Sequence, residues 1–227
     1  MNLPEHYDTL YRTSIEKIRS GQYQLDPLID SAEDDRMGLT LLLRPDKQTK
    51  QQIQAFLSEL RAIDPAQYYY PDSDIHVTVM SIIPCYSGFE LGQISVPDYV
   101  ELIRKSIPAH SRIEISFKGI TASPSCVMVQ GFLSDNTLNH LRDNLRANFR
   151  DSDLEQSIDK RYAIQTAHAT VARFRAPLRD TEAYLRVLEK YRNHDFSTFT
   201  VDTLELVHND WYQREQFVQR LHRFNLG

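Results

Sequence analysis

Hydrophobic and polar positions alternate strictly in one short stretch of the chain, and this stretch occurs twice. The first copy is Ile75-His76-Val77-Thr78-Val79, and the second, 92 residues later, is Ala167-His168-Ala169-Thr170-Val171. Alternation of this kind is typical of a β-strand with one buried face, because successive side chains on a strand point to opposite sides. Each copy therefore predicts a strand that buries its apolar residues and presents one imidazole and one hydroxyl side by side.

Periodic apolar positions also predict the other elements of the chain. Asp46 is a suitable N-cap for one of the helices, and Pro84 is expected to end the first His-Thr strand. The expected helices cover residues 5–20, 46–63, 96–107, 135–149 and 181–191, and the expected strands cover residues 37–43, 75–83, 112–120, 126–133, 165–175, 198–208 and 216–224, of which the last two form a hairpin around Asn209-Asp210.

The order of these elements indicates an internal duplication. After the N-terminal helix the order is β-α-β-α-β-β-α-β-α-β-β, and each His-Thr strand is preceded and followed by a helix. This pattern predicts an α+β fold with two pseudo-symmetric lobes of antiparallel sheet, helices packed outside and a central cleft. A two-fold axis would bring both His-Thr strands to that cleft. The expected division is an N-terminal helical extension, residues 1–35, and a bilobal domain, residues 36–227.

The composition is that of an ordinary globular protein, with 227 residues of which 41% are hydrophobic and 25% are charged. No apolar run approaches the roughly 18 residues that a membrane span needs, and the N-terminus lacks the pattern of a secretory signal. Cys85 and Cys126 have no metal-ligand spacing and are interpreted as free thiols. We therefore expect a monomeric, cytoplasmic protein with no membrane partner.

The charge of the chain limits its ligands. A net charge of −5 argues against a protein that coats long duplex nucleic acid. Residues 161–227 nevertheless have a balance of +2, whereas residues 1–160 have −7. Positive potential near Arg161, Arg173, Arg175 and Arg179 would allow a small anionic ligand to bind.

Two histidines that face one cleft are suited to acid–base chemistry on a phosphate. Imidazole titrates near neutral pH, so a neutral histidine accepts a proton while a protonated one donates it. One histidine would activate water, the other would protonate the leaving ribose oxygen, and the threonine hydroxyls would hold the non-bridging oxygens. Acid–base help contributes about 10²–10⁴-fold, so positioning and charge stabilisation must supply the rest of the acceleration.

Other interpretations of the motifs explain less of the pattern. One His-x-Thr on a strand is common by chance, but two copies in matching contexts are not. Zinc binding usually needs three or four protein ligands, and no third ligand recurs at matching spacing; the threonines would also have no role in it. We therefore expect no metal and no cofactor. The histidines without a repeated context are interpreted as surface or structural residues, and they are His6, His110, His140, His194, His208 and His222.

The motifs His76-Val77-Thr78-Val79 and His168-Ala169-Thr170-Val171 resemble those of the 2H phosphoesterase superfamily. That superfamily includes bacterial 2′-5′ RNA ligase-like proteins, RNA 2′,3′-cyclic phosphodiesterases and plant cyclic-phosphate phosphodiesterases. The resemblance covers roughly residues 36–226 and agrees with the length and the bilobal pattern. It implies that His76 and His168 are the acid–base pair and that Thr78 and Thr170 are phosphate anchors. The extra N-terminal segment and the divergent loops indicate a divergent branch.

The expected function is therefore metal-independent hydrolysis of a 2′,3′-cyclic phosphate, or a related phosphodiester, of a small nucleotide or an RNA end. The alternative is a non-catalytic module that binds nucleotides or RNA ends in the same cleft. Tyr70 and Tyr86 are further candidate substrate contacts, because tyrosine stacks on bases, although packing against the lobe explains them equally well. Arg173 is another candidate, but its parity differs from that of His168, so a regular strand without a bulge would point it away from the cleft.

Overall fold

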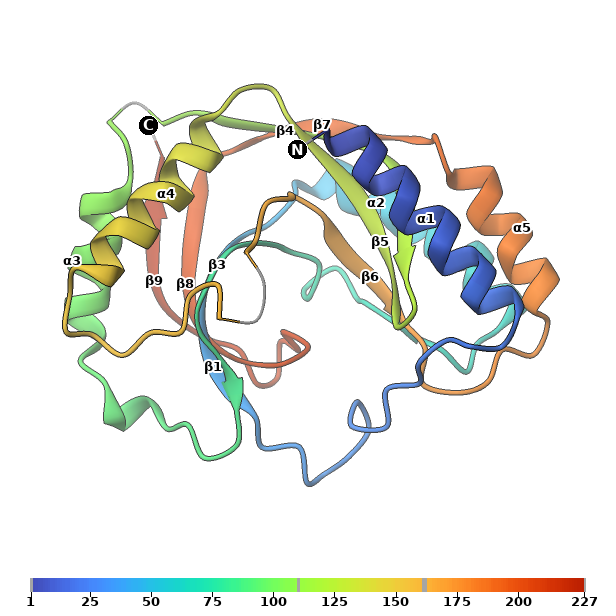
Figure 1. Cartoon of the computed structure of the whole chain (residues 1–227), viewed down its shortest axis with the longest axis horizontal. Helices are drawn as coiled ribbons and strands as arrows, with labels where there is room; N and C mark the ends of the chain where they lie inside the picture. Colours follow the sequence, from blue (N-terminus) through green and yellow to red (C-terminus); the bar gives the residue numbers. More distant parts are fainter. Residues whose placement is uncertain (1, 110, 161–162, 227) are drawn as a thin grey trace.

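Two antiparallel β-sheets form the framework of the molecule (Figure 1). In this computed structural model, residues 2–109, 111–160 and 163–226 are described. Within them, one sheet has the strand order β3-β1-β8-β9 and the other β2-β6-β5-β4-β7. The strands are β1 (Met37–Leu43), β2 (Tyr68–Tyr69), β3 (Val77–Tyr86), β4 (Ile113–Ser123), β5 (Cys126–Leu133), β6 (Ala169–Arg173), β7 (Asp195–Val201), β8 (Thr203–Asp210) and β9 (Gln219–Asn225), and the helices are α1 (Leu3–Arg19), α2 (Lys47–Ile63), the short 3₁₀ helix η1 (Leu91–Gln93), α3 (Val96–Ser106), α4 (Thr137–Arg150) and α5 (Thr181–Tyr191).

Helices cover each sheet on its outer side. Helices α3 and α4 pack against each other and contact β9 and β3 of the four-stranded sheet, whereas α1, α2 and α5 pack on the five-stranded sheet. The predicted α+β fold, with two lobes of antiparallel sheet and helices outside, is confirmed. Among the described residues, no helix combines the length and the apolar character needed to cross a membrane.

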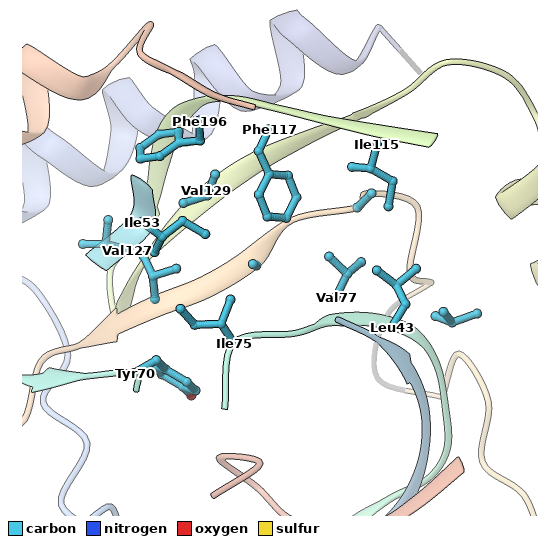
Figure 2. Packing of buried hydrophobic residues seen from close by; sticks show 14 of the residues in the cluster. Leu43, Ile53, Tyr70, Ile75, Val77, Ile115, Phe117, Val127, Val129 and Phe196 are labelled. Carbon is cyan, nitrogen blue, oxygen red and sulfur yellow. The ribbon is translucent and has the colours of Figure 1, made fainter. Parts of the chain in front are cut away.

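Two helices cross from one lobe to the other. Helix α2 follows β1 of the four-stranded sheet but packs against β7 and β6 of the five-stranded sheet. Helix α4 follows β5 of the five-stranded sheet but packs against β3 of the other. One hydrophobic core therefore joins the two sheets. In Figure 2, Ile75, which lies just before β3, and Val77, the first residue of β3, face Ile115 and Phe117 of β4 across this core.

The expected end of the first His-Thr strand is wrong. Strand β3 continues through Pro84 as far as Tyr86. It lies at the edge of the four-stranded sheet and pairs only with β1 among the described strands. Proline is tolerated on an edge strand, because the missing N–H removes no ladder hydrogen bond on the open side.

The expected strand over residues 198–208 is also wrong, because the structure divides it between β7 and β8, which belong to different sheets. The period-2 pattern changes parity at the junction: Phe199 and Val201 are buried in β7, whereas Leu204 and Leu206 are buried in β8. The buried positions on either side are three residues apart, and this shift marks where the chain passes from one sheet to the other. The hairpin partner β9 begins only at Gln219, so Asn209-Asp210 ends β8 rather than forming the turn.

Helix α1, at the start of the expected N-terminal extension, is joined to the five-stranded sheet by buried side chains. Its Tyr11 and Ile18 are part of the common core, and the Ser14 hydroxyl donates to the Ala122 carbonyl in β4 at 2.8 Å. At its beginning, the Asn2 side chain accepts from the Glu5 N–H, as an N-cap does. Residues 3–19 therefore pack as part of the lobe that carries the second His-Thr motif.

Candidate active site

The two repeated motifs have the same pattern of burial. In each copy the three apolar positions are buried, whereas the histidine and the threonine are partly exposed. Strand β3 begins at Val77 and β6 at Ala169, so each histidine lies immediately before its strand and each threonine is the second strand residue. The apolar side chains pack into the core, and the polar ones point to the opposite side.

That opposite side is a pocket between the two lobes, with a volume of about 170 Å³. Its walls contain His76 and Thr78 from one lobe and His168 and Thr170 from the other. The structure therefore brings all four motif residues to one place. Tyr70 and Arg173 line the same pocket, together with Trp211 and other residues that lie outside the two motifs.

Each histidine is oriented by the residue two positions before it. The Nδ1 atom of His76 lies 2.7 Å from the Asp74 carbonyl oxygen, and Nδ1 of His168 lies 2.6 Å from the Thr166 hydroxyl. A carbonyl oxygen only accepts, so Nδ1 of His76 carries the proton and its Nε2 is the basic atom. The Thr166 hydroxyl either donates or accepts, so it is compatible with both tautomers of His168.

Burial lowers the pKa of both imidazoles to about 4. For His76 the hydrogen bond to Asp74 opposes this effect, while the positive charges of Arg44, His168 and Arg173 add to it. For His168 the Arg142 charge adds to burial. Both histidines are therefore neutral in the free protein at pH 7.

Both motif strands contain an irregularity at the valine that follows the threonine. Thr78 and Met80 pair with consecutive residues of β1, so Val79 is an extra residue in the ladder. In the same way, Thr170 and Ala172 pair with consecutive residues of β5, so Val171 is extra. Bulges of this kind re-aim the side chains that follow them.

The bulge explains the position of Arg173, which on a regular strand would point away from the cleft. Its side chain lines the pocket instead, and Ser81, 92 residues earlier, does the same in the other lobe. The Arg173 Nε donates to the Tyr70 hydroxyl at 2.9 Å, and its guanidinium lies 3.7 Å from the Asp26 carboxylate. Tyr70 and Asp26 therefore fix the Arg173 side chain so that its guanidinium lines the pocket.

The other candidates lie elsewhere. Tyr86 is outside the pocket, exposed, and donates from its hydroxyl to Glu155. Arg175 lies 3.1 Å from the Asp30 carboxylate, and Arg179 lies 3.9 Å from Asp64; neither lines the pocket. Arg161, expected to add positive potential, and His110, expected to be a surface or structural histidine, lie outside the described residues.

Arg142 of α4, which the repeated motifs gave no reason to select, is a fully buried arginine that connects them. Its Nε donates to the Val79 carbonyl at 3.1 Å, and its Nη2 donates to the carbonyls of Thr78, at 3.0 Å, and Thr166, at 2.8 Å. Burial lowers its pKa to about 10, so it stays charged at neutral pH. The available signal was an arginine on the apolar stripe of the helix, between Leu138 and Leu145.

Gly131 of β5 allows the chain to pass close to the second motif. An added Cβ would overlap the carbonyl oxygen of Ala167, the residue before His168. We expect Gly131→Ala to lower the free energy of unfolding by about 1–3 kcal/mol, because overpacking forces a backbone shift. Gly92→Ala is the control, since a Cβ there has open space, and we expect a change within about 0.5 kcal/mol. Urea unfolding measures both, and equal effects at the two sites would contradict the prediction.

Among the described residues, no group of three or more His, Cys, Asp or Glu side chains is arranged to hold a metal ion. The structure thus places the two histidines and the two threonines of the motifs, together with the Arg173 guanidinium, around a small pocket. This set can hold an anion and move protons at its oxygens.

The sequence of the chain matches the model of the 2′-5′ RNA ligase superfamily over residues 49–212. The chain belongs to this superfamily. The resemblance of its two motifs to those of the 2H phosphoesterases is thereby confirmed. No curated protein sequence matches the chain.

Solved structures share the superfamily fold. TT0787 of Thermus thermophilus is 15% identical with a TM-score of 0.59, and the match covers 83% of this chain and 97% of that one. E. coli LigT complexed with 3′-AMP is 12% identical with a TM-score of 0.53, covering 84% and 98%. ATU0111 of Agrobacterium tumefaciens, a protein of unknown function, is 14% identical with a TM-score of 0.58, covering 91% and 97%. At these identities the likeness establishes the fold alone.

Proposed function

We propose that this member of the superfamily is a phosphodiesterase that hydrolyses a 2′,3′-cyclic phosphate, or a related phosphodiester, of a small nucleotide or an RNA end. The observation that carries the proposal is the pocket in which both histidines and both threonines meet. A binding site for an anion alone would not require one proton acceptor and one proton donor on opposite lobes. The superfamily of phosphoesterases to which the chain belongs supports the same reaction type.

The proposed reaction is a direct displacement at phosphorus. Nε2 of one histidine takes a proton from water as the water oxygen bonds to phosphorus, and the bond from phosphorus to a ribose oxygen breaks. The second histidine gives its Nε2 proton to that departing oxygen. After one turnover the first histidine has gained a proton and the second has lost one, and proton exchange with solvent restores both. The fixed Nδ1–H of His76 makes it the candidate base. Thr78, Thr170 and the Arg173 charge would hold the non-bridging oxygens.

A related fold has been seen with ligands of this chemistry. LigT of E. coli has been solved with 3′-AMP, with phosphate, with ATP and with NADP+. Each of these carries phosphate, and three of them are nucleotides. We take this as support for a nucleotide-like substrate of the present chain.

One observation favours the alternative, a module that binds nucleotides or RNA ends without turnover. Because burial lowers the pKa of both imidazoles to about 4, the protonated acid is scarce in the free protein at pH 7. A phosphate between the two rings would raise both pKa values and restore the acid. The two functions therefore differ in whether bound phosphate is turned over.

Turnover of nucleoside 2′,3′-cyclic phosphates in excess chelator distinguishes the two functions. We expect a nucleoside monophosphate as the product, at a rate that the chelator does not change. Binding of the cyclic nucleotide without any product would favour the module. A rate that the chelator abolishes would contradict the metal-independent mechanism.

The low histidine pKa values predict an unusual pH dependence. The productive free protein has one neutral and one protonated histidine, and with both pKa values near 4 this form is most abundant near pH 4. Above about pH 5 its share falls roughly tenfold for each unit of pH. We expect kcat/KM to decline from pH 5 to pH 8. A flat profile over this range would contradict a mechanism with paired histidines.

A further inference from the structure

A second compartment opens beside the catalytic pocket, on the side of helix α1. Its volume is about 420 Å³. It shares Thr78, Ile164 and His168 with the catalytic pocket, so the two cavities meet at the same motif residues. A molecule whose phosphate lies against His168 and Thr78 would therefore have two directions in which to extend.

The two compartments differ in charge. The catalytic pocket is lined by Arg173 and Asp159. Among the described residues that line the α1-side compartment there is no Lys, Arg, Asp or Glu, and His6 is the one imidazole there besides the shared histidine of the second motif. Apolar groups from Leu10 and Met128 form part of the walls, and the neighbouring Gln165 and Thr166 offer amide and hydroxyl groups. An uncharged group with hydrogen-bonding edges fits this lining.

The volumes also differ in what they can hold. Small-molecule sites usually measure roughly 300–1,000 Å³. The catalytic pocket, at about 170 Å³, is small for a nucleoside in addition to its phosphate. The α1-side compartment, at about 420 Å³, is within the usual range.

The wall that α1 contributes is held firmly. Tyr7 is buried and donates from its hydroxyl to the Gly131 carbonyl of β5 at 3.3 Å. Burial raises its pKa to about 12, so it remains an uncharged phenol. Leu10, one turn further along the same helix, is partly exposed at the compartment. The matched part of the superfamily begins at residue 49, so α1 lies outside it.

We propose that the compartment between α1 and the second His-Thr motif binds the nucleoside portion of the substrate, while its phosphate lies at the shared wall of His168 and Thr78. The proposal rests on the proposed function for the identity of the phosphate site. It assigns to α1 a role in selecting an uncharged, flat organic group. Inorganic phosphate would use the catalytic pocket alone.

Two substitutions at Leu10 test this assignment. Leu10→Trp fills the compartment, and Leu10→Glu places a charge in it, at a position exposed enough to accept either side chain. The matched controls are Thr13→Trp and Thr13→Glu, because Thr13 is exposed on the same helix and lines neither compartment. Calorimetric titration with inorganic phosphate and with a nucleoside 2′-monophosphate measures the two parts of the site separately.

We expect both Leu10 variants to weaken nucleotide binding by about tenfold or more, the range for losing one base contact. Phosphate affinity should stay within about twofold of the wild-type value, because substitutions at exposed positions usually have small effects. KM for a cyclic nucleotide should rise more than kcat falls, and the Thr13 controls should match the wild type.

Several outcomes would overturn the assignment. If both Leu10 variants bind the nucleotide as tightly as the wild type, the assignment is wrong, even if the enzyme turns over cyclic nucleotides. It is also wrong if the variants lose affinity for phosphate and for the nucleotide equally, or if the wild type binds the two ligands with equal affinity. If the wild type shows no turnover but its nucleotide affinity depends on Leu10, the compartment stands and the proposed catalysis fails.

Discussion

Alanine in place of His76 or His168 is expected to lower kcat/KM for a 2′,3′-cyclic nucleotide by about 10³-fold or more. Each change removes a proton-transfer group, which typically contributes about 10²–10⁴-fold, and also a contact to the phosphate. Both histidines lie in one pocket, so they act as a unit. The double variant should therefore be little worse than either single variant.

The matched control for this prediction is His140→Ala. His140 is exposed on α4 and does not line the pocket, so its loss should leave kcat/KM within about twofold, as for most surface changes. Steady-state kinetics with circular dichroism of each variant separates lost chemistry from lost folding. Either single variant that retains more than a tenth of wild-type turnover while folded would remove that histidine from the mechanism.

Replacement of Arg142 by Met is expected to have the second large effect. The change leaves three buried or partly buried carbonyl acceptors, two in the first motif and one just before the second, without this donor. Each unsatisfied buried group costs about 1–3 kcal/mol, so we expect the free energy of unfolding to fall by about 3 kcal/mol or more. Because these carbonyls belong to Thr78, Val79 and Thr166, kcat should also fall by about 10²-fold or more, as for lost positioning of catalytic groups.

Two further measurements show whether Arg142 acts on the site or on stability alone. Its charge lowers the pKa of His168, so Arg142→Met should raise that pKa, which NMR titration of the imidazole detects. Arg142→Lys keeps the charge but not the fork of donors, and it should keep the His168 pKa low while losing activity. Arg150→Met, on the exposed side of the same helix, is the control. An unshifted His168 pKa in Arg142→Met would leave this arginine a purely structural role.

The meeting of the two histidines and the two threonines in one pocket was predictable because the signal is local. Two strands that bury one face each produce a period-2 pattern, and its repetition indicates that both copies face one cleft. The helices were predictable for the same reason, since each has its own apolar stripe. Each strand copy and each helix could be recognised from its own residues, and the shared cleft followed from comparing the two copies.

The remaining parts of the site depend on partners that are distant in sequence. Arg173 enters the pocket because Val171 is an extra residue against β5, and a bulge depends on the neighbouring strand. Pro84 is tolerated because β3 is an edge strand, which its own residues do not indicate. Arg142 has its acceptors in two other segments of the chain. Helix α1 lines a cavity only together with residues that are distant from it in sequence, such as Thr78 and His168.

The crossing of α2 and α4 between the lobes has a mechanical consequence. In each lobe, one of the packed helices directly follows a strand that belongs to the other lobe. The lobes are thus interlaced rather than hinged, and pulling them apart would strip a helix from each. The two imidazoles are carried on these interlaced halves, so their separation is set when the protein folds. A ligand that contacts both imidazoles must therefore fit the gap that the folded lobes leave between them.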